Sequence, residues 1–229
     1  MLAFDTAQGA LSAAVHDGEG ELASSFELRT RGHAEALMPL LETVLAEAAL
    51  GFADLDALAV TVGPGTFTGL RVGLAAARGL ALALELPLVG ITTLEAIAAP
   101  VSAEAGEMIV ASFDAKRNEI YLQPFTSAHA PLAEPSLVSL DEAAAHLPPG
   151  RLVLVGTGTA LLAAALDRRK ADLRFAEARP QPDAAAVARL ALARLATKGP
   201  EAFRAAPLPL YIRTPDAKLP GGRDPGAAA

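Results

Sequence analysis

Short apolar segments alternate with polar turns through the first part of the chain. Residues 2–4, 11–16 and 21–28 have the length of strands, and Asp17-Gly18-Glu19-Gly20 separates the last two. Strand-length segments joined by turns rich in Gly and Asp are typical of hairpins. The pattern therefore predicts an antiparallel meander of three strands.

Helical spacing begins after this meander. Within residues 33–50 the apolar positions recur every three or four residues, at Ala34, Leu37, Met38, Leu41, Leu45 and Ala48. This period predicts a helix that ends at Gly51 and is distorted at Pro39. Residues 58–62 then predict a strand, and a glycine-rich turn leads into a long Ala/Leu helix. The first hundred residues close with a strand at 88–91 and a helix at 93–98.

The second half repeats this kind of organisation. Its predicted elements are strands at 108–113, 119–125 and 152–155, and helices at 140–146, 159–166 and 183–197, the last capped by Asp183. The composition loosens between Pro100 and Gly106, which indicates a domain boundary. We therefore predict α/β subdomains at 1–100 and 101–214, a cleft between them, and a mobile tail at 215–229.

Composition and charge exclude several classes of protein. The 229 residues are 52% hydrophobic, carry a net charge of −7, and include 4% aromatic residues and no cysteine. An acidic chain poor in aromatic residues is a poor candidate for binding nucleic acid alone. Disulfides and thiolate sites are excluded. The apolar run 70–86 contains Arg71, Arg78 and Glu85, so we interpret it as a buried or interface helix and expect a cytoplasmic protein without a membrane span.

The glycine-rich turn Gly63-Pro64-Gly65-Thr66-Phe67-Thr68-Gly69 connects a strand to a helix. Leu70 and Arg71 follow it where a phosphate-binding P-loop needs Lys and Ser or Thr, and the spacing also fails the dinucleotide pattern. Two explanations stay open: generic phosphate contact, or close approach of another backbone. The candidates for nucleotide contact are Asp5, Gly63, Gly65, Thr66 and Thr68.

Candidate chemistry outside this turn is sparse. Asp5 ends the first strand, where a carboxylate could hold Mg²⁺ through water or activate a nucleophile, although a turn-forming role is as ordinary. Asp114 has the same two roles open to it. The four histidines contain no helical i, i+4 pair, so a histidine metal site has no support.

Small residues form a strip along the predicted second helix. Gly69, Gly73, Ala76 and Ala77 fall on one side of this helix at three- or four-residue spacing. Such a strip allows another helix to approach closely, either within the chain or from another protein.

Several segments distributed along the chain are informative together: residues 2–7, 63–71, 76–82, 90–96, 114–121, 211–213 and 217–221. These segments resemble one known family, the bacterial TsaB (YeaZ) proteins. The resemblance implies an α/β fold of the actin/Hsp70/sugar-kinase (ASKHA) type. It also implies a role in making N6-threonylcarbamoyladenosine at position 37 of tRNAs that read codons starting with A. The implied partners are a TsaD-type catalytic paralogue and a TsaE-type ATPase, with a homodimer when alone and tRNA contacted only through the complex.

The resemblance also implies that this chain is a scaffold and not the catalyst. TsaD-type chains carry a metal-binding His-x-x-x-His pair on the helix after the strand matched here by residues 88–91. Thr93 and Ile97 stand at those two positions, and Ile97 cannot bind a metal. We therefore expect an accessory subunit with no catalytic residues, no metal and no cofactor.

The two helices 33–50 and 69–84 are the predicted partner surface. Its predicted contact residues are Leu37, Leu41, Gly69, Leu70, Gly73, Ala76, Ala77 and Leu80. On this interpretation Gly73→Leu blocks complex formation and leaves the monomer folded. The alternatives are an ATP-dependent small-molecule kinase or ATPase, with turns 63–65 and 156–158 around the nucleotide and Asp5 near Mg²⁺, and a metalloprotease, which the missing ligand pair disfavours.

Overall fold

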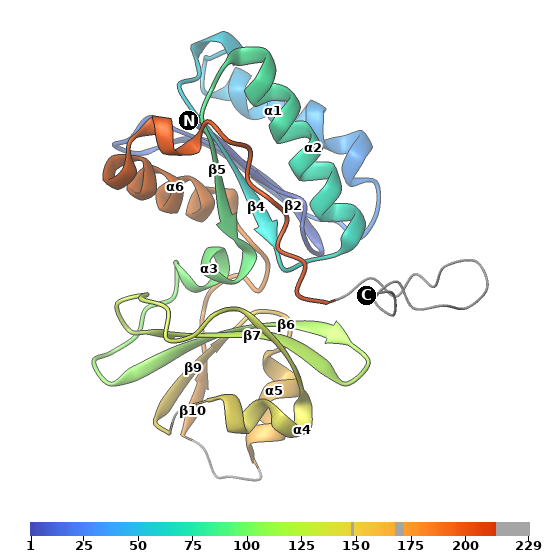
Figure 1. Cartoon of the computed structure of the whole chain (residues 1–229), viewed down its shortest axis with the longest axis vertical. Helices are drawn as coiled ribbons and strands as arrows, with labels where there is room; N and C mark the ends of the chain where they lie inside the picture. Colours follow the sequence, from blue (N-terminus) through green and yellow to red (C-terminus); the bar gives the residue numbers. More distant parts are fainter. Residues whose placement is uncertain (148, 168–171, 214–229) are drawn as a thin grey trace, which may run out of the picture.

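The computed structural model describes residues 1–147, 149–167 and 172–213 of the chain. These residues form two halves, each built on a five-stranded sheet, which are stacked along the long axis of the molecule (Figure 1). The predicted mobile tail at 215–229 and the matching segment 217–221 lie outside the described residues.

The first sheet contains the predicted meander and two parallel strands. Its order is β3-β2-β1-β4-β5. The strands are β1 (Leu2–Asp5), β2 (Ala10–His16), β3 (Glu21–Leu28), β4 (Leu58–Gly63) and β5 (Leu88–Thr92). β1, β2 and β3 pair antiparallel, which confirms the meander, whereas β4 lies parallel to β1 and to β5. Parallel pairing places the carboxyl ends of β1 and β4 at the edge that faces the second half.

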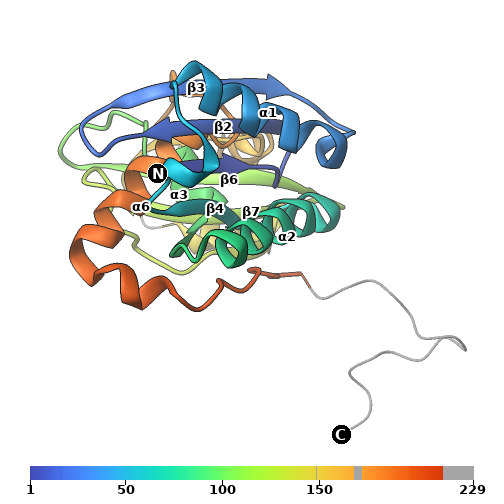
Figure 2. The ribbon, with the colours of Figure 1, turned by 90° about the horizontal axis from the view of Figure 1, so that it is seen from above.

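Helices cover both faces of this sheet (Figure 2). α1 (His33–Glu47) and α2 (Phe67–Leu84) pack on one face, and α1 continues through Pro39. A short 3₁₀ turn, η1 (Phe52–Asp54), links α1 to β4. α6 (Ala184–Lys198) packs on the other face, followed by η3 (Pro200–Phe203). Strands β1, β2 and β4 are therefore buried on both sides, as their mostly apolar sequences require, whereas no residue of the edge strand β3 is fully buried.

The second half has a sheet of order β10-β9-β6-β7-β8. Its elements are β6 (Glu107–Lys116), β7 (Glu119–Thr126), β8 (Ser136–Ser139), β9 (Arg151–Val155), β10 (Leu173–Phe175), α4 (Leu140–Ala143), η2 (Ala144–His146) and α5 (Thr159–Asp167). α4 and α5 cover one face, and α3 (Thr93–Ala98) covers the other. Because α3 also contacts β4 and α6, it lies between the two halves.

The predicted domain boundaries are wrong at one element. Sequence order places helix α6 in the predicted second subdomain, but it packs on the first sheet. Val187, Ala188 and Ala191 on α6 are fully buried in one cluster with Val89 and Ile91 of β5. The apolar face of the first sheet opposite α1 and α2 must be buried, and α6 packs against it. The first half thus combines residues 1–98 with residues 184–213.

Helix α2 is unusually apolar for its exposure. By length and composition it is the one helix of the described residues that could cross a membrane, with a mean hydropathy of 1.3 over 18 residues. Only 28% of that window is buried inside the molecule. Much apolar surface on α2 therefore faces outward.

Candidate functional site

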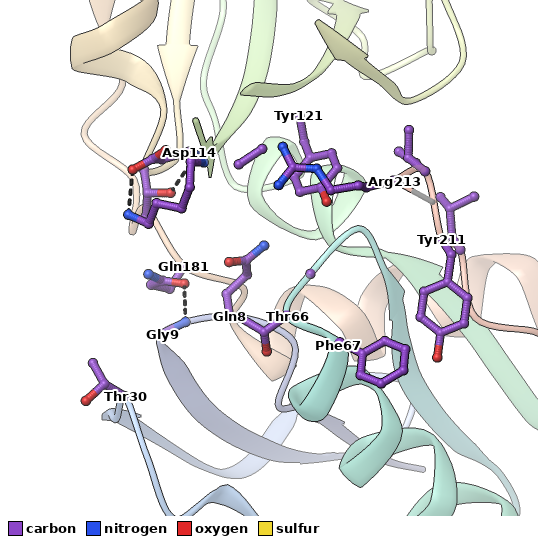
Figure 3. A pocket seen from close by; sticks show the side chains of 16 residues that line it. Gln8, Gly9, Thr30, Thr66, Phe67, Asp114, Tyr121, Gln181, Tyr211 and Arg213 are labelled. Atoms are coloured by element: carbon purple, nitrogen blue, oxygen red, sulfur yellow. Dashed lines mark hydrogen bonds and ion pairs between the residues drawn. The ribbon is translucent and has the colours of Figure 1, made fainter. Parts of the chain in front are cut away.

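A cleft of about 740 Å³ opens between the two halves (Figure 3). Its wall contains residues of the β1–β2 turn, the β4–α2 turn, the β6–β7 hairpin and the segment 210–213. The lining residues are Gln8, Gly9, Thr30, Gly65, Thr66, Phe67, Asp114, Ala115, Lys116, Tyr121, Thr157, Gln181, Leu210, Tyr211, Ile212 and Arg213. Turns from both sheets thus converge on one space.

The glycine-rich turn brings two backbones into close contact. A Cβ added at Gly65 would lie 2.5 Å from the Ala7 carbonyl oxygen, and one at Gly69 would overlap the Thr6 carbonyl oxygen. One turn further along α2, a Cβ at Gly73 would lie 2.5 Å from Thr6 Oγ1. Side chains are excluded at all three positions because the β1–β2 turn occupies that space. Close approach of another backbone is therefore confirmed as a reason for the glycines.

The polar groups of this turn form hydrogen bonds with each other and with the β1–β2 turn. The Thr66 amide donates to the Ala7 carbonyl at 2.8 Å, and Thr6 Oγ1 donates to the Gly69 carbonyl at 2.7 Å. Thr66 caps α2, because its Oγ1 accepts from the Gly69 amide at 3.1 Å. The amides of Thr66 and Gly69 are thus bound within the molecule and are not offered to a phosphate.

The candidates for nucleotide contact do not form one cluster. Gly65 and Thr66 line the cleft, whereas the cleft wall of the described residues does not include Asp5, Gly63 or Thr68. Gly63 has a φ of +115°, and a Cβ there would lie 2.8 Å from the Leu210 carbonyl oxygen. The absence of a side chain at Gly63 therefore permits close contact with Leu210, and Gly63 does not line the cleft.

Asp5 is buried beneath the cleft. Its Oδ1 accepts hydrogen bonds from the Thr61 hydroxyl at 2.5 Å and the Ala7 amide at 3.1 Å. Its Oδ2 has no hydrogen-bond partner among the described residues. Burial raises the pKa of this carboxyl from 3.8 to about 7, against the opposing effect of the two hydrogen bonds. The contact with Ala7 is the turn-forming role left open by the sequence.

Asp114 lies on the opposite wall of the cleft. Its Oδ2 accepts from Lys116 Nζ at 2.7 Å and its Oδ1 from the Lys116 amide at 2.8 Å. These bonds hold the pKa of the Asp114 carboxyl below its usual value. Lys116, Arg117 and Asn118 all have positive φ in the hairpin that follows. Asp114 is thus an ionised group that shapes a tight turn at the cleft.

The two positions aligned with the paralogue's metal ligands have internal partners here. Thr93 is fully buried, and its Oγ1 donates to the Pro64 carbonyl at 2.5 Å. Ile97 packs in the core between α3 and the second sheet. Within the described ranges, no three His, Cys, Asp or Glu side chains lie close enough together to hold a metal ion.

The predicted partner surface faces largely inward, which is a correction. Six of its eight residues are buried inside the monomer: Leu37, Leu41, Gly69, Leu70, Gly73 and Ala77. Ala76 and Leu80 are half-buried. The spacing of the small strip permits close packing, and inside the monomer Gly69 and Gly73 pack against Thr6, while Ala76 and Ala77 pack with the first core cluster. Gly73→Leu would accordingly disrupt the monomer.

A second strip of small residues lies on the outer face of α2. Ala75, Gly79 and Ala83 are exposed and follow one another at four-residue spacing. A Cβ added at Gly79 would meet nothing within 4 Å. Glycine inside a helix costs roughly 1 kcal/mol relative to alanine, and no contact among the described residues requires it here. Sequence reasoning missed this strip, although the same spacing was visible.

The model of the family described as TsaD, tRNA N6-adenosine threonylcarbamoyltransferase, matches residues 27–220. The chain belongs to this family. Among curated relatives, the TsaB protein of Escherichia coli, named for tRNA threonylcarbamoyladenosine biosynthesis, is 38% identical over 122 residues. That match covers 53% of this chain and 52% of the E. coli protein, so the chain spans about half the length of the curated relatives it matches.

Solved structures extend this likeness over the whole fold. YeaZ from Pseudomonas aeruginosa has a TM-score of 0.76 at 27% identity, with 91% of this chain and 98% of that chain covered. These comparisons confirm the resemblance to TsaB within the TsaD family. An activator of 2-hydroxyisocaproyl-CoA dehydratase from Clostridium difficile, solved with bound ADPNP, has a TM-score of 0.51 at 11% identity. That likeness concerns the fold alone, and the ASKHA-type fold is confirmed.

Proposed function

We propose that this chain is a non-catalytic subunit in the synthesis of N6-threonylcarbamoyladenosine in tRNA. Its membership of the TsaD family and the TsaB relatives carry this proposal. In this role a TsaD-type paralogue transfers the threonylcarbamoyl group from threonylcarbamoyl-AMP to the adenine amine, and a TsaE-type ATPase joins the complex. The chain would work in the cytoplasm, where its substrate tRNAs are found.

The assignment as non-catalytic rests on the helix α3. A metal that activates an acyl donor needs ligands that leave coordination positions open. Thr93 instead donates to Pro64, and Ile97 is 1% exposed in an apolar core. These side chains support a structural role for α3, at the junction between the two halves.

The outer face of α2, together with the exposed side of α1, is the proposed partner surface. Small residues at Ala75, Gly79 and Ala83 permit a partner helix to approach closely. Leu82 on α2 is 82% exposed and Met38 on α1 is 37% exposed, so both helices also present apolar side chains to solvent. This surface would bind a TsaD-type helix pair, or a second copy of the chain when no partner is present.

The net charge of −7 supports a complex in which another subunit binds the tRNA. Binding to tRNA depends on neutralising phosphates with Lys and Arg, which an acidic subunit cannot do alone. The TsaD-type partner would therefore supply the cationic surface, and this chain would contact tRNA only through the complex.

The test is reconstitution of the modification from purified components. Threonylcarbamoyl transfer to tRNA is followed with the TsaD-type and TsaE-type proteins, in the presence and absence of this chain. We expect modified nucleoside only when the chain is present. Equal product without it would disprove the proposed requirement.

An ATP-dependent kinase or ATPase is the second candidate, and the cleft favours it. The cleft lies between the two halves of an ASKHA-type fold and is about 740 Å³ in volume. Calorimetric titration of the isolated chain with ATP and Mg²⁺ separates the two candidates. Tight binding with turnover would favour this one.

A further inference from the structure

The segment between η3 and Arg213 forms a strap along the first half. Residues 204–213 (the strap) run alongside α2 in the opposite direction and pass β5 and β4 toward the second half (Figure 1). Arg204 Nη1 donates to the Glu85 carbonyl at 2.8 Å, and Arg78 Nη2 donates to the Pro207 carbonyl at 2.6 Å. These two hydrogen bonds attach the strap to Arg78 within α2 and to Glu85, the residue that follows α2.

Two further contacts hold the strap near the cleft. The Leu210 amide donates to the Val62 carbonyl at 2.7 Å. The Tyr211 and Phe67 rings lie 5.8 Å apart at the start of α2. Four separate contacts therefore attach the strap to the first half before it reaches the space between the halves.

Beyond Tyr211 the strap bonds to the other half. Arg213 Nη2 donates to Glu119 Oε2 at the start of β7, and the two side chains form an ion pair. Tyr121 lines the cleft next to this pair (Figure 3). The strap therefore connects the two halves, in addition to the chain crossings at residues 99–106 and 176–183 and the packing of α3.

The Arg213–Glu119 pair is suited to being broken and remade. The Arg213 side chain is 23% exposed and the Glu119 side chain is 35% exposed. Ion pairs with this access to water contribute little free energy, so loss of the bond shifts a two-state equilibrium by about five-fold. The four contacts on the first half would keep the strap in place when this bond opens.

We propose that the strap is a latch that holds the two halves together across the cleft, with the Arg213–Glu119 pair as its releasable bond. Leu210, Tyr211 and Ile212 form one wall of the cleft, so release of Arg213 widens the entrance that they border. The latch is a property of the isolated chain and does not depend on the proposed role in tRNA modification.

The test measures the distance between the halves in the full-length chain. The chain has no cysteine, so spin labels can be attached at Glu42→Cys on α1 and Ala160→Cys on α5, both exposed positions. With the latch intact, pulsed electron resonance should give a narrow distance distribution. In Arg213→Gln and in Glu119→Gln, the population at longer distance should rise about five-fold.

Two variants serve as controls. Arg213→Lys keeps the charge and should retain the narrow distribution. Arg204→Gln removes a strap contact that lies within the first half, and should also leave the distribution unchanged. The proposal is overturned if Arg213→Gln and Glu119→Gln match the unsubstituted chain, or if Arg204→Gln broadens the distribution as much as they do.

Discussion

At the scale of single residues, Asp5 has the most perturbed environment near the site. The carboxyl is completely buried at the end of β1, and one of its oxygens has no partner among the described residues. Loss of hydration raises the pKa of Asp5 to about 7, so the group is partly protonated at neutral pH. Stability should consequently depend on pH through this residue.

Asp5→Asn tests this dependence. In the unfolded chain the carboxyl ionises near 3.8, and in the folded chain near 7, so unfolding between these values releases a proton. The contribution of Asp5 is therefore fully present below about pH 4 and falls by roughly 4 kcal/mol as the pH rises to about 7. Asparagine cannot ionise, so the variant should lose this decline. Urea unfolding of both proteins across this range measures it, and parallel pH profiles would contradict the assignment.

Gly73 and Gly79 lie on opposite faces of α2, so the effects of substituting them can be compared. Gly73→Ala places a methyl group 2.5 Å from Thr6 Oγ1 and should destabilise the protein by about 1–3 kcal/mol. Gly79→Ala meets open space and should stabilise the monomer by up to about 1 kcal/mol, because alanine favours the helix. Urea midpoints compare them directly. Equal effects of the two substitutions would show that the inward and outward faces have been misassigned.

At the scale of elements, the hydrophobic pattern could predict most of the fold but not the orientation of α2. Strongly periodic segments such as α1 and the β1–β3 meander follow from local spacing. β8 and β10 are only four and three residues long and mostly not buried, so they leave little periodic signal. On α2, inward and outward strips share the same spacing. Which strip faces inward depends on the contact with Thr6, which lies 63 residues from Gly69 in the sequence.

Gly79→Leu tests the outer face of α2 as a partner surface. A leucine side chain there should prevent close approach of a second helix and weaken partner binding by about ten-fold or more, with the monomer still folded. Co-purification with the TsaD-type protein measures this, and Gly79→Ala serves as the smaller control. Undiminished binding of Gly79→Leu would place the partner elsewhere.

At the scale of the whole molecule, the two-half architecture follows from the sequence, whereas the exchange of elements between halves does not. The duplicated order of strands, glycine turn and helix indicated two α/β subdomains. The return of α6 to the first sheet and the pair Arg213–Glu119 join residues far apart in the chain, 94 positions in the second case. Local patterns contain no information on such contacts. The cleft residues Gln181 and Tyr211 were missed for the same reason.

Titration of this chain into a fixed amount of TsaD-type and TsaE-type proteins tests the central claim most directly. The rate of threonylcarbamoyl transfer to tRNA should rise from near zero and saturate at about one equivalent of chain, as expected of a stoichiometric subunit. Gly79→Leu should require about ten-fold more protein to reach the same rate. A rate that is independent of the amount of chain added would contradict the account.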